Sequence, residues 1–471
     1  MTPAIPGARA RRSAVVFLCA SLLALGACED DPARPDNRPA HIVSASVVDT
    51  AGPITRWLRV DLDRPGAVDV FYEPVDGGRT FRMRADSAAE SHEIYLPRLL
   101  SDTTYDYAVR VFDEETASDS IVRGTFVTGT LPTSITNIDI DVEGDASFEV
   151  MIVGQGQNAT AGMFGGQIGI EPDGTVVWYF ASTGFPLAAQ PMPGSHDLAF
   201  LDGGQQGIVR VAPDGHIVAR LVTEGGVFGS VHHDIAPNGP DRILFIQKDT
   251  QTVGPDVITG EALWEWNTTT GAVEEKWSVF DHLDWNTDRT IASQKSNWLH
   301  ANALSMGPRG NVVMSLNRLN QVISIAPDFQ SLEWRLGGPN ETHALAPQDT
   351  FVMQHSTFEL PGNRVILFDN VAGGSPDAYS RAMEFQLEAD TAYVIWEYVP
   401  EPTIQADLRS GIYRLANGNS LVTFSVMPLI VDEVDPAGQR VWRFTGHEMT
   451  PAFRAVPLES IAGEVRVDAM P

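Results

Sequence analysis

The chain has 471 residues, of which 61 are Asp or Glu and 32 are Lys or Arg, so its formal net charge at pH 7 is -29. So acidic a surface repels nucleic acid and anionic lipid, which excludes nucleic-acid binding as a general role. The length allows two or three domains, and strand-length runs between turn residues, rich in Val, Thr and aromatics, favour an all-β protein.

The first 28 residues have the order of a secretory signal peptide. Three arginines precede an apolar run from Ser13 to Leu25 that is too short to span a bilayer with ease. Leu25-Gly26-Ala27-Cys28 then indicates a bacterial lipobox, in which Cys28 would carry lipid and become the mature N-terminus. The alternatives are a plain signal peptide and a short anchor helix. Residues 29–40 are acidic and contain proline, as expected of a tether.

This leader predicts a lipoprotein of the bacterial cell envelope, facing the periplasm or exposed at the surface. Removing Arg9, Arg11 and Arg12 takes three positive charges from -29 and leaves -32 for the mature chain. The other cysteine, Cys19, lies within the apolar run. The mature protein is therefore expected to have no disulfide, no cysteine nucleophile and no Cys-ligated zinc.

Residues 41–132 are expected to form a small β-sandwich. Alternating apolar and polar residues at 57–62 and 68–72 indicate strands. The run 100–109, with Tyr105 and Tyr107, resembles the corner and penultimate strand of a fibronectin type III domain. The sequence shows no chemistry in this part.

Residues 135–450 repeat a two-part unit. One part is an apolar strand, a turn such as Pro172-Asp173-Gly174 and a strand with tryptophan; it recurs near 211–215, 325–334 and 434–442. The other part opens each unit, in four cases with a histidine. Six units spaced by about 40 to 50 residues favour a six-bladed β-propeller. A large β-sandwich or a β-helix is the alternative, and 451–471 are expected to form a C-terminal tail.

The four histidines that open units are candidate site residues. Because the first strand of each propeller blade lines the central channel, equivalent positions converge there, and these are His196, His233, His300 and His355. Asn302, two residues after His300, is expected on the same side of its strand. Arg318 lies on the next strand of that unit, where a guanidinium can hold a tetrahedral oxyanion through two hydrogen bonds.

Two chemistries suit this set of residues. Imidazoles bind zinc, copper or iron, but Asp197 and Asp234 follow their histidines directly and would face the other way on a strand. No metal site is therefore assigned. A neutral imidazole is also a nucleophile toward sulfuryl or phosphoryl groups, and neighbouring His, Arg and Asn would stabilise the charge that develops.

Several motifs in order resemble those of the bacterial aryl sulfotransferases that use no nucleotide sulfate donor. They are His300-Ala-Asn302, Ser315-Leu-Asn-Arg318, Trp334-Arg-Leu-Gly-Gly338, Gln354-His355, Leu367-Phe-Asp-Asn370, Ser380-Arg-Ala-Met-Glu-Phe385 and Leu415-Ala-Asn-Gly-Asn419. The resemblance covers about 145–450, and the N-terminal sandwich matches the family layout.

The resemblance implies a six-bladed propeller that transfers a sulfuryl group from a phenolic sulfate ester to a phenol by a ping-pong route, without a cofactor. It implies that His355 becomes the sulfohistidine. His300 and Arg318 would bind sulfuryl oxygens with help from Asn302, and His233, in preference to His232, would be the remaining histidine. The family suggests no role for His196, which we place with the substrate-binding residues.

Three other functions stay open at this stage. Water could attack the same sulfohistidine, which would make the protein an aryl sulfate hydrolase. The propeller could be a non-catalytic binding or scaffold module of the envelope. A metal-dependent enzyme is the third. The physiological donor and acceptor and the oligomeric state do not follow from the sequence.

Overall fold

A computed structural model describes residues 39–471, except 51, 113–120, 157–162, 188, 224–229, 373–377 and 448. The predicted signal peptide, Cys28 and the tether up to residue 38 lie outside the described residues. None of the helices in the described part is long and apolar enough to cross a membrane.

The N-terminal part is one sheet built on two long strands. Its members are β1 (Ile42–Asp49), β2 (Arg56–Pro74), β3 (Thr80–Leu96), β4 (Thr104–Phe112), β5 (Ile121–Val127) and β32 (Val465–Val467). β2 changes register near Gly66, pairing with β1 before it and with β4 after it. Tyr105 is fully buried, and its hydroxyl accepts a hydrogen bond from Leu100 N at 2.8 Å, as suits a corner tyrosine.

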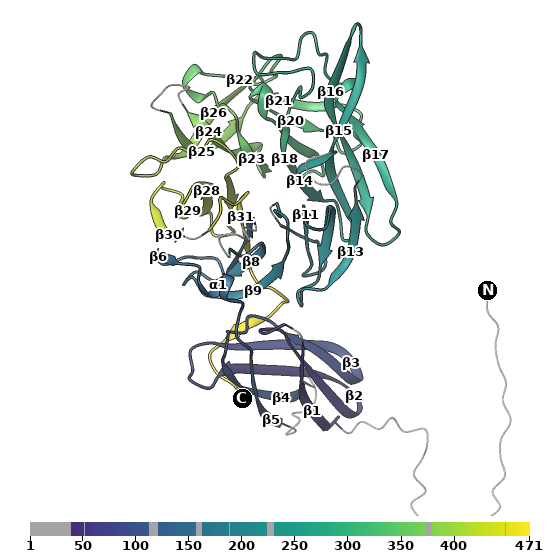
Figure 1. The fold of residues 1–471 in the computed structure, drawn as a ribbon, viewed down its shortest axis with the longest axis vertical. Helices are drawn as coiled ribbons and strands as arrows, with labels where there is room; N and C mark the ends of the chain where they lie inside the picture. The colour runs from purple at the N-terminus through teal and green to yellow at the C-terminus, as the bar shows by residue number, and fades with distance from the viewer. Residues whose placement is uncertain are drawn as a thin grey trace, which may run out of the picture. The chain divides into compact units, whose positions relative to one another are not determined.

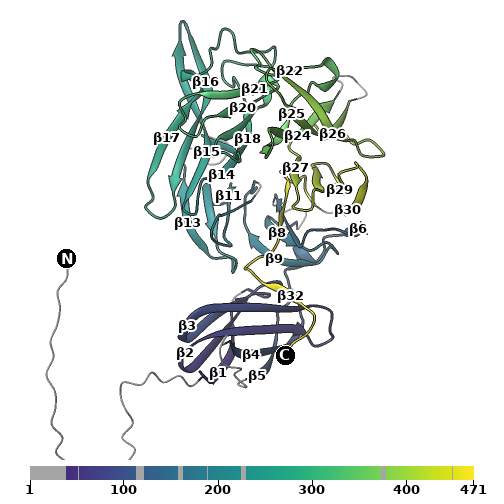
Figure 2. The ribbon, with the colours of Figure 1, turned by 180° about the vertical axis from the view of Figure 1, so that it is seen from behind.

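Six sheets of four or five strands make up the rest of the described chain (Figures 1 and 2). The first three sheets contain β31 (Ala455–Leu458), β7 (Val150–Gln155), β8 (Gly166–Ile170) and β9 (Val176–Ala181); β10 (Gln190–Pro191), β11 (Leu198–Asp202), β12 (Gly207–Val211) and β13 (Ile217–Val222); and β14 (Val231–Pro237), β15 (Arg242–Val253), β16 (Asp256–Asn267) and β17 (Val273–Ser278).

The other three sheets follow in chain order. They contain β18 (Ala301–Met306), β19 (Val312–Leu316), β20 (Gln321–Ile325) and β21 (Leu332–Leu336); β23 (His355–Leu360), β24 (Arg364–Ala372), β25 (Tyr379–Leu387), β26 (Thr391–Tyr398) and β22 (Ala344–Leu345); and β27 (Gly411–Arg414), β28 (Ser420–Phe424), β29 (Leu429–Val434), β30 (Arg440–Gly446) and β6 (Ile140–Gly144). The helices are short: α1 (Thr133–Thr136), η2 (Val279–Asp281), η3 (Asn317–Leu319) and η4 (Pro347–Asp349).

The sheets pack on one another through their middle strands. β19, β20 and β28 are buried at every residue, because both faces of each sheet meet a neighbouring sheet. First strands of successive sheets contact each other, β14 with β18, β18 with β23, β23 with β27 and β27 with β31. Residues that begin first strands are thereby gathered at the centre of the six sheets (Figure 1).

The tryptophan that follows a Pro-Asp-Gly turn links neighbouring sheets. Gly174 and Gly215 have φ near +87° and +88°, the left-handed region that these hairpin turns need. Trp178 Nε1 donates to Pro213 O at 2.7 Å, and Trp442 Nε1 donates to Pro172 O at 3.0 Å. Each indole therefore reaches the turn of the next sheet, as the repeat predicts.

The C-terminal residues are not a free tail. β31 pairs with β7, and β32 pairs with β3, so 451–471 differ from the tail expected from the sequence. The physical reason is that an unpaired sheet edge exposes hydrogen-bonding groups, and the end of the chain covers the edge left by β7. The four-residue β31 is too short to show the repeat.

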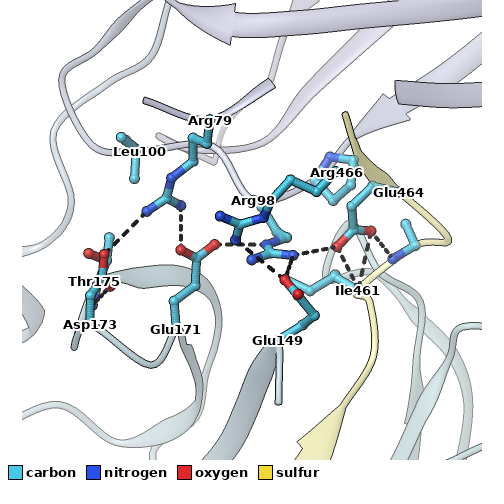
Figure 3. Close-up of polar contacts among 12 residues, drawn as sticks. Arg79, Arg98, Leu100, Glu149, Glu171, Asp173, Thr175, Ile461, Glu464 and Arg466 are labelled. Atoms are coloured by element: carbon cyan, nitrogen blue, oxygen red, sulfur yellow. Dashed lines mark hydrogen bonds and ion pairs between the residues drawn. The ribbon is translucent and has the colours of Figure 1, made fainter. Parts of the chain in front are cut away.

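Ionic contacts lie where the N-terminal sheet meets the β31-β7-β8-β9 sheet (Figure 3). Arg98 is 2% exposed, and its guanidinium donates to Glu171 at 2.7 Å and to Glu149 at 3.0 Å. Arg79 also contacts Glu171, at 2.7 Å, and Glu464 lies 3.9 Å from Arg98. The buried charges are thus matched by charges of opposite sign, as burial requires.

Candidate active site

Three of the predicted histidines and the predicted arginine line one cavity of about 740 Å³. His233 comes from β14, His300 directly precedes β18, and His355 begins β23. Arg318 comes from η3, next to Asn317 and close to Asn320, which also line the cavity. Four residues from three sheets are therefore brought together.

A bulge at the start of each first strand turns these side chains toward the cavity. Register shifts occur between Val231 and Ile235, between Ala301 and Ala303, and between His355 and Phe358. At the same places His233, His300 and Ser356 adopt φ of +63°, +53° and +50°, which residues with a Cβ seldom do. Such local strain commonly marks functional sites.

The hydrogen bonds of His355 define its tautomer. Its Nδ1 lies 2.8 Å from Asn370 Oδ1 and 3.1 Å from Met353 O, and since both oxygens are acceptors, Nδ1 carries the hydrogen. Nε2 accepts a hydrogen bond from Arg409 N at 3.2 Å, so it bears the lone pair. In the cavity, neutral His355 therefore has the electronic form of a nucleophile at Nε2.

The other histidines are also neutral. Burial lowers the pKa of His355 to about 4, and burial with the charge of Arg318 lowers that of His300 to about 4. Burial, and to a smaller extent the nearby His232 and His300, lower the pKa of His233 well below its ordinary value. Asn297 Nδ2 donates to His300 Nδ1 at 3.1 Å, which leaves the hydrogen of neutral His300 on Nε2 as a donor for a ligand.

His232 and Asp234 support the site from behind. His232 Nδ1 lies 2.7 Å from His233 Nδ1, so one imidazole donates to the other. Asp234 is buried and binds Arg454 at 2.8 and 2.9 Å, and it accepts from Leu304 N at 3.0 Å. Its carboxylate is thus engaged away from the cavity. Among the described residues, none form a group of three or more His, Cys, Asp or Glu placed to hold a metal ion.

His196 is not brought to the cavity. It is exposed in the turn between β10 and β11, beside Gly463. The repeat aligned it with the other histidines, but its sheet begins one strand earlier, with the two-residue β10. The expected convergence of four histidines is therefore corrected to three, with His232 behind them.

Asn302 also lies elsewhere than expected. It is fully buried, its Nδ2 donates to Gln354 O at 2.8 Å, and it is absent from the residues that line the cavity. The bulge after Ala301 breaks the two-residue alternation that would have placed it beside His300. Its contact holds the residue before His355, which gives it a positioning role in the structure.

Asn370 and Arg409 belong to the site, although sequence reasoning assigned them no role. Asn370 is fully buried; besides accepting from His355, its Nδ2 donates to Ala406 O and, at 3.1 Å, to Arg409 O. Asn370 lies in one of the recognised motifs, which was the available signal. Arg409 lies in a loop outside the repeat, where no pattern could find it.

Replacing Asn370 by alanine is expected to lower kcat by about 10²-fold for any reaction in which His355 is the nucleophile, because the His355 ring loses the acceptor that orients it. The ¹⁵N NMR spectrum of the His355 imidazole should show the Nδ1–H tautomer diluted by the Nε2–H form. Asn419→Ala, an amide change far from the histidines in sequence, is the control. Unchanged kcat with an altered tautomer would contradict the expected role.

The pH dependence of kcat/KM follows from the lowered histidine pKa. Since only neutral His355 has a free lone pair, kcat/KM for a reaction at His355 should stay level from pH 8 to about pH 5 and fall below its pKa of about 4. An acid limb near the ordinary value of 6.5 would contradict this. As the pH falls from 6.5 to about 4, His355 takes up a proton in the unfolded chain but stays neutral in the folded protein, so the stability of the fold decreases over this range. Fluorescence at each pH must therefore show that the protein is folded.

The fold and the cavity together define an all-β protein with a cavity lined by three histidines and two arginines. The profile of the family described as Arylsulfotransferase (ASST) matches residues 145–450, more than half of the chain. The chain belongs to this family, which confirms the resemblance seen in the motifs. Membership suggests arylsulfotransferase activity and aryl sulfate substrates.

Similar solved structures include proteins of several kinds. A protein of unknown function from Bacteroides caccae is 14% identical, with a TM-score of 0.43, covering 67% of this chain and 100% of that one. A chain of the nidogen/laminin complex is 10% identical, with a TM-score of 0.42 and coverage of 66% and 98%. Virginiamycin B lyase from Staphylococcus aureus is 10% identical, with a TM-score of 0.36 and coverage of 65% and 88%. With TM-scores below 0.5, these likenesses assign no function to the chain. No curated protein matches it.

Proposed function

We propose that this protein moves a sulfuryl group from a phenolic sulfate ester to a phenol, with His355 as the covalent carrier. One observation carries the proposal. The described residues that line the cavity include two arginines and three histidines but no carboxylate, in a chain with a net charge of -29. A wall with cations and without described carboxylates attracts an anion in spite of the negative charge of the chain.

The rest of the cavity lining supports an aromatic substrate. Ile291 and Leu408 are apolar side chains with high exposure, Leu408 at 61%, and Met353 is 36% exposed. Val352 and Phe453 also line the cavity. An aryl sulfate would place its sulfate against the arginines and histidines and its ring against these apolar groups.

In the first half-reaction, the lone pair of His355 Nε2 attacks sulfur and the bond from sulfur to the phenolic oxygen breaks. Arg318 and His300 Nε2–H stabilise the sulfuryl oxygens, and His233 is placed to assist the departing phenolate. The imidazole becomes positively charged as the N–S bond forms, which strengthens the hydrogen bond from Nδ1 to Asn370. In the second half-reaction a phenol oxygen attacks sulfur and the N–S bond breaks, which returns its electron pair to His355 Nε2. The phenol proton passes through His233 to the solvent, which protonates the phenolate released first.

We also propose that the six sheets are the six blades of a β-propeller and that the N-terminal sheet is the fibronectin type III-like sandwich. The contacts between successive first strands support this arrangement. For the leader, we propose lipidation at Cys28 and a place in the cell envelope; metabolic labelling with a fatty acid, lost in Cys28→Ala, tests it.

The decisive experiment is mass spectrometry of the mature protein after incubation with 4-nitrophenyl sulfate and no acceptor. We expect one added SO₃ group, mapped to His355 at neutral or alkaline pH, and its transfer to phenol when phenol is added. An adduct that yields only free sulfate with phenol present would make the protein a hydrolase. Bound ester without an adduct would indicate a non-catalytic binding protein and overturn the proposal.

A further inference from the structure

The loop between β26 and β27 brings Arg409 to the nucleophile. Arg409 N donates to His355 Nε2 at 3.2 Å, and Arg409 O accepts from Asn370 Nδ2 at 3.1 Å. The N–H of Arg409 is thus held by His355, the proposed sulfuryl carrier, and its carbonyl is held by Asn370. Arg409 is accordingly one of the residues that line the cavity.

The backbone of this loop is strained in a way that serves the contact. Arg409 and Ser410 have φ of +59° and +74°, and in the described part of the chain no other two consecutive non-glycine residues have positive φ. Residues with a Cβ disfavour this backbone region, so the surrounding structure must impose the conformation. Its result is a main-chain N–H aimed at His355 Nε2.

The guanidinium of Arg409 is half-buried, and no carboxylate among the described residues forms an ion pair with it. Its Nη1 donates to Pro451 O at 2.7 Å, and its Cζ lies 4.3 Å from the centre of the Phe185 ring. By contrast, the buried arginines Arg98, Arg381 and Arg454 each contact a carboxylate. A partly desolvated cation whose oxygen contact in the described part of the chain is the carbonyl of Pro451 is suited to an anionic ligand.

We infer that Arg409 is a further catalytic residue: its guanidinium binds the sulfuryl oxygens together with Arg318, and its main-chain N–H moves from His355 Nε2 to a sulfuryl oxygen when the sulfohistidine forms. This inference rests on the proposed function and extends it. Arg318 comes from η3 and Arg409 from the loop between β26 and β27, and both line the cavity, so the two cations can hold different oxygens of one sulfuryl group.

The exchange of hydrogen bonds conserves every proton. In the resting site the N–H of Arg409 occupies the lone pair of His355 Nε2. That lone pair forms the N–S bond while the electrons of the S–O bond leave with the phenolate. The N–H of Arg409 can then no longer donate to Nε2. It donates instead to an oxygen of the sulfuryl group on Nε2, where negative charge is concentrated. Return of the sulfuryl group to a phenol restores the original contact.

The test compares Arg409→Ala and Arg409→Lys with the full mature protein. Alanine keeps the main-chain N–H and the backbone conformation available to any residue with a Cβ, so it removes only the guanidinium. We expect kcat/KM for 4-nitrophenyl sulfate to fall about 10²- to 10³-fold in Arg409→Ala, with partial recovery in Arg409→Lys. Arg220→Ala is the matched control, because Arg220 is exposed on β13, does not line the cavity, and donates to Gln205 Oε1 at 3.1 Å.

A binding measurement that needs no turnover completes the test. In His355→Ala protein, adding Arg409→Ala should raise the Kd for 4-nitrophenyl sulfate at least about tenfold by titration calorimetry. If the unchanged protein forms the His355 adduct while Arg409→Ala keeps its kcat/KM and Kd within twofold, the inference is overturned and the proposed function stands. If the unchanged protein forms no adduct, the proposed function fails and a catalytic role for Arg409 fails with it.

Discussion

Replacing His355 by alanine should reduce sulfuryl transfer by about 10⁴-fold or more, because it removes the imidazole that we propose forms the covalent intermediate. The imidazole is 4% exposed, carries its hydrogen on the Nδ1 that faces Asn370, and presents Nε2 to the cavity. Its neighbours His233 and His300 would still bind the ester. The variant should therefore retain a measurable Kd while losing both the burst of phenol release and the adduct.

The control for this change is His216→Ala. His216 is an exposed histidine beside Asp214, on the turn between β12 and β13, and its loss should leave the rate unchanged. Removal of His355 leaves Asn370 Oδ1 without its donor, at a cost of about 1–3 kcal/mol, so thermal melting must show that the variant is folded. An adduct that persists in His355→Ala and maps to His300 or His233 would move the nucleophile to that residue.

Replacing Arg98 by methionine should lower the free energy of unfolding by about 3–5 kcal/mol, the usual result of removing one partner from a buried ionic group. Arg98 is 2% exposed and contacts Glu171 and Glu149, with Glu464 at 3.9 Å (Figure 3). Without Arg98, the buried carboxylate of Glu464 would lose the cation that lies 3.9 Å from it. Urea denaturation, followed by tryptophan fluorescence, measures the change.

Arg466→Met is the matched variant, because Arg466 is 48% exposed and contacts the same Glu149 at 3.3 Å. A solvent-exposed ion pair contributes about 0–1 kcal/mol, so this variant should differ little from the unchanged protein. Equal losses in Arg98→Met and Arg466→Met would show that burial does not decide the strength of this network. Sulfuryl transfer at 25 °C should persist in both, since neither residue lines the cavity.

Features that depend on neighbours in sequence were predictable. The Pro-Asp-Gly turns, the linking tryptophans and the strands follow from short patterns, since φ at Gly174 and the burial of a strand are local matters. The position of His233, His300 and His355 at the start of their repeat units predicted that they lie together. The motifs around Arg318 and Gln354-His355 then indicated the family, which the family profile confirms.

Features that depend on a bulge or on the end of the chain were not predictable. Asn302 missed the cavity because a single extra residue after Ala301 reverses the side that a strand residue faces. His196 lies outside the cavity because its sheet begins with β10, and a two-residue strand has no alternation that the sequence could reveal. Residues 451–471 were expected to be a tail, although Arg454 binds Asp234 beneath His233 and β31 completes the first sheet.

The sequence alone was enough to determine the family, and its repeats and motifs predicted the four site residues His233, His300, Arg318 and His355, which line one cavity in the structure. Only the tertiary structure decided how these groups can act. The tautomer of His355 depends on Asn370, 15 residues away, and on the N–H of Arg409, 54 residues away. The absence of carboxylates from the described cavity wall depends on side chains from several sheets. Hydrogen bonds and burial of this kind arise between distant segments, so no local pattern records them.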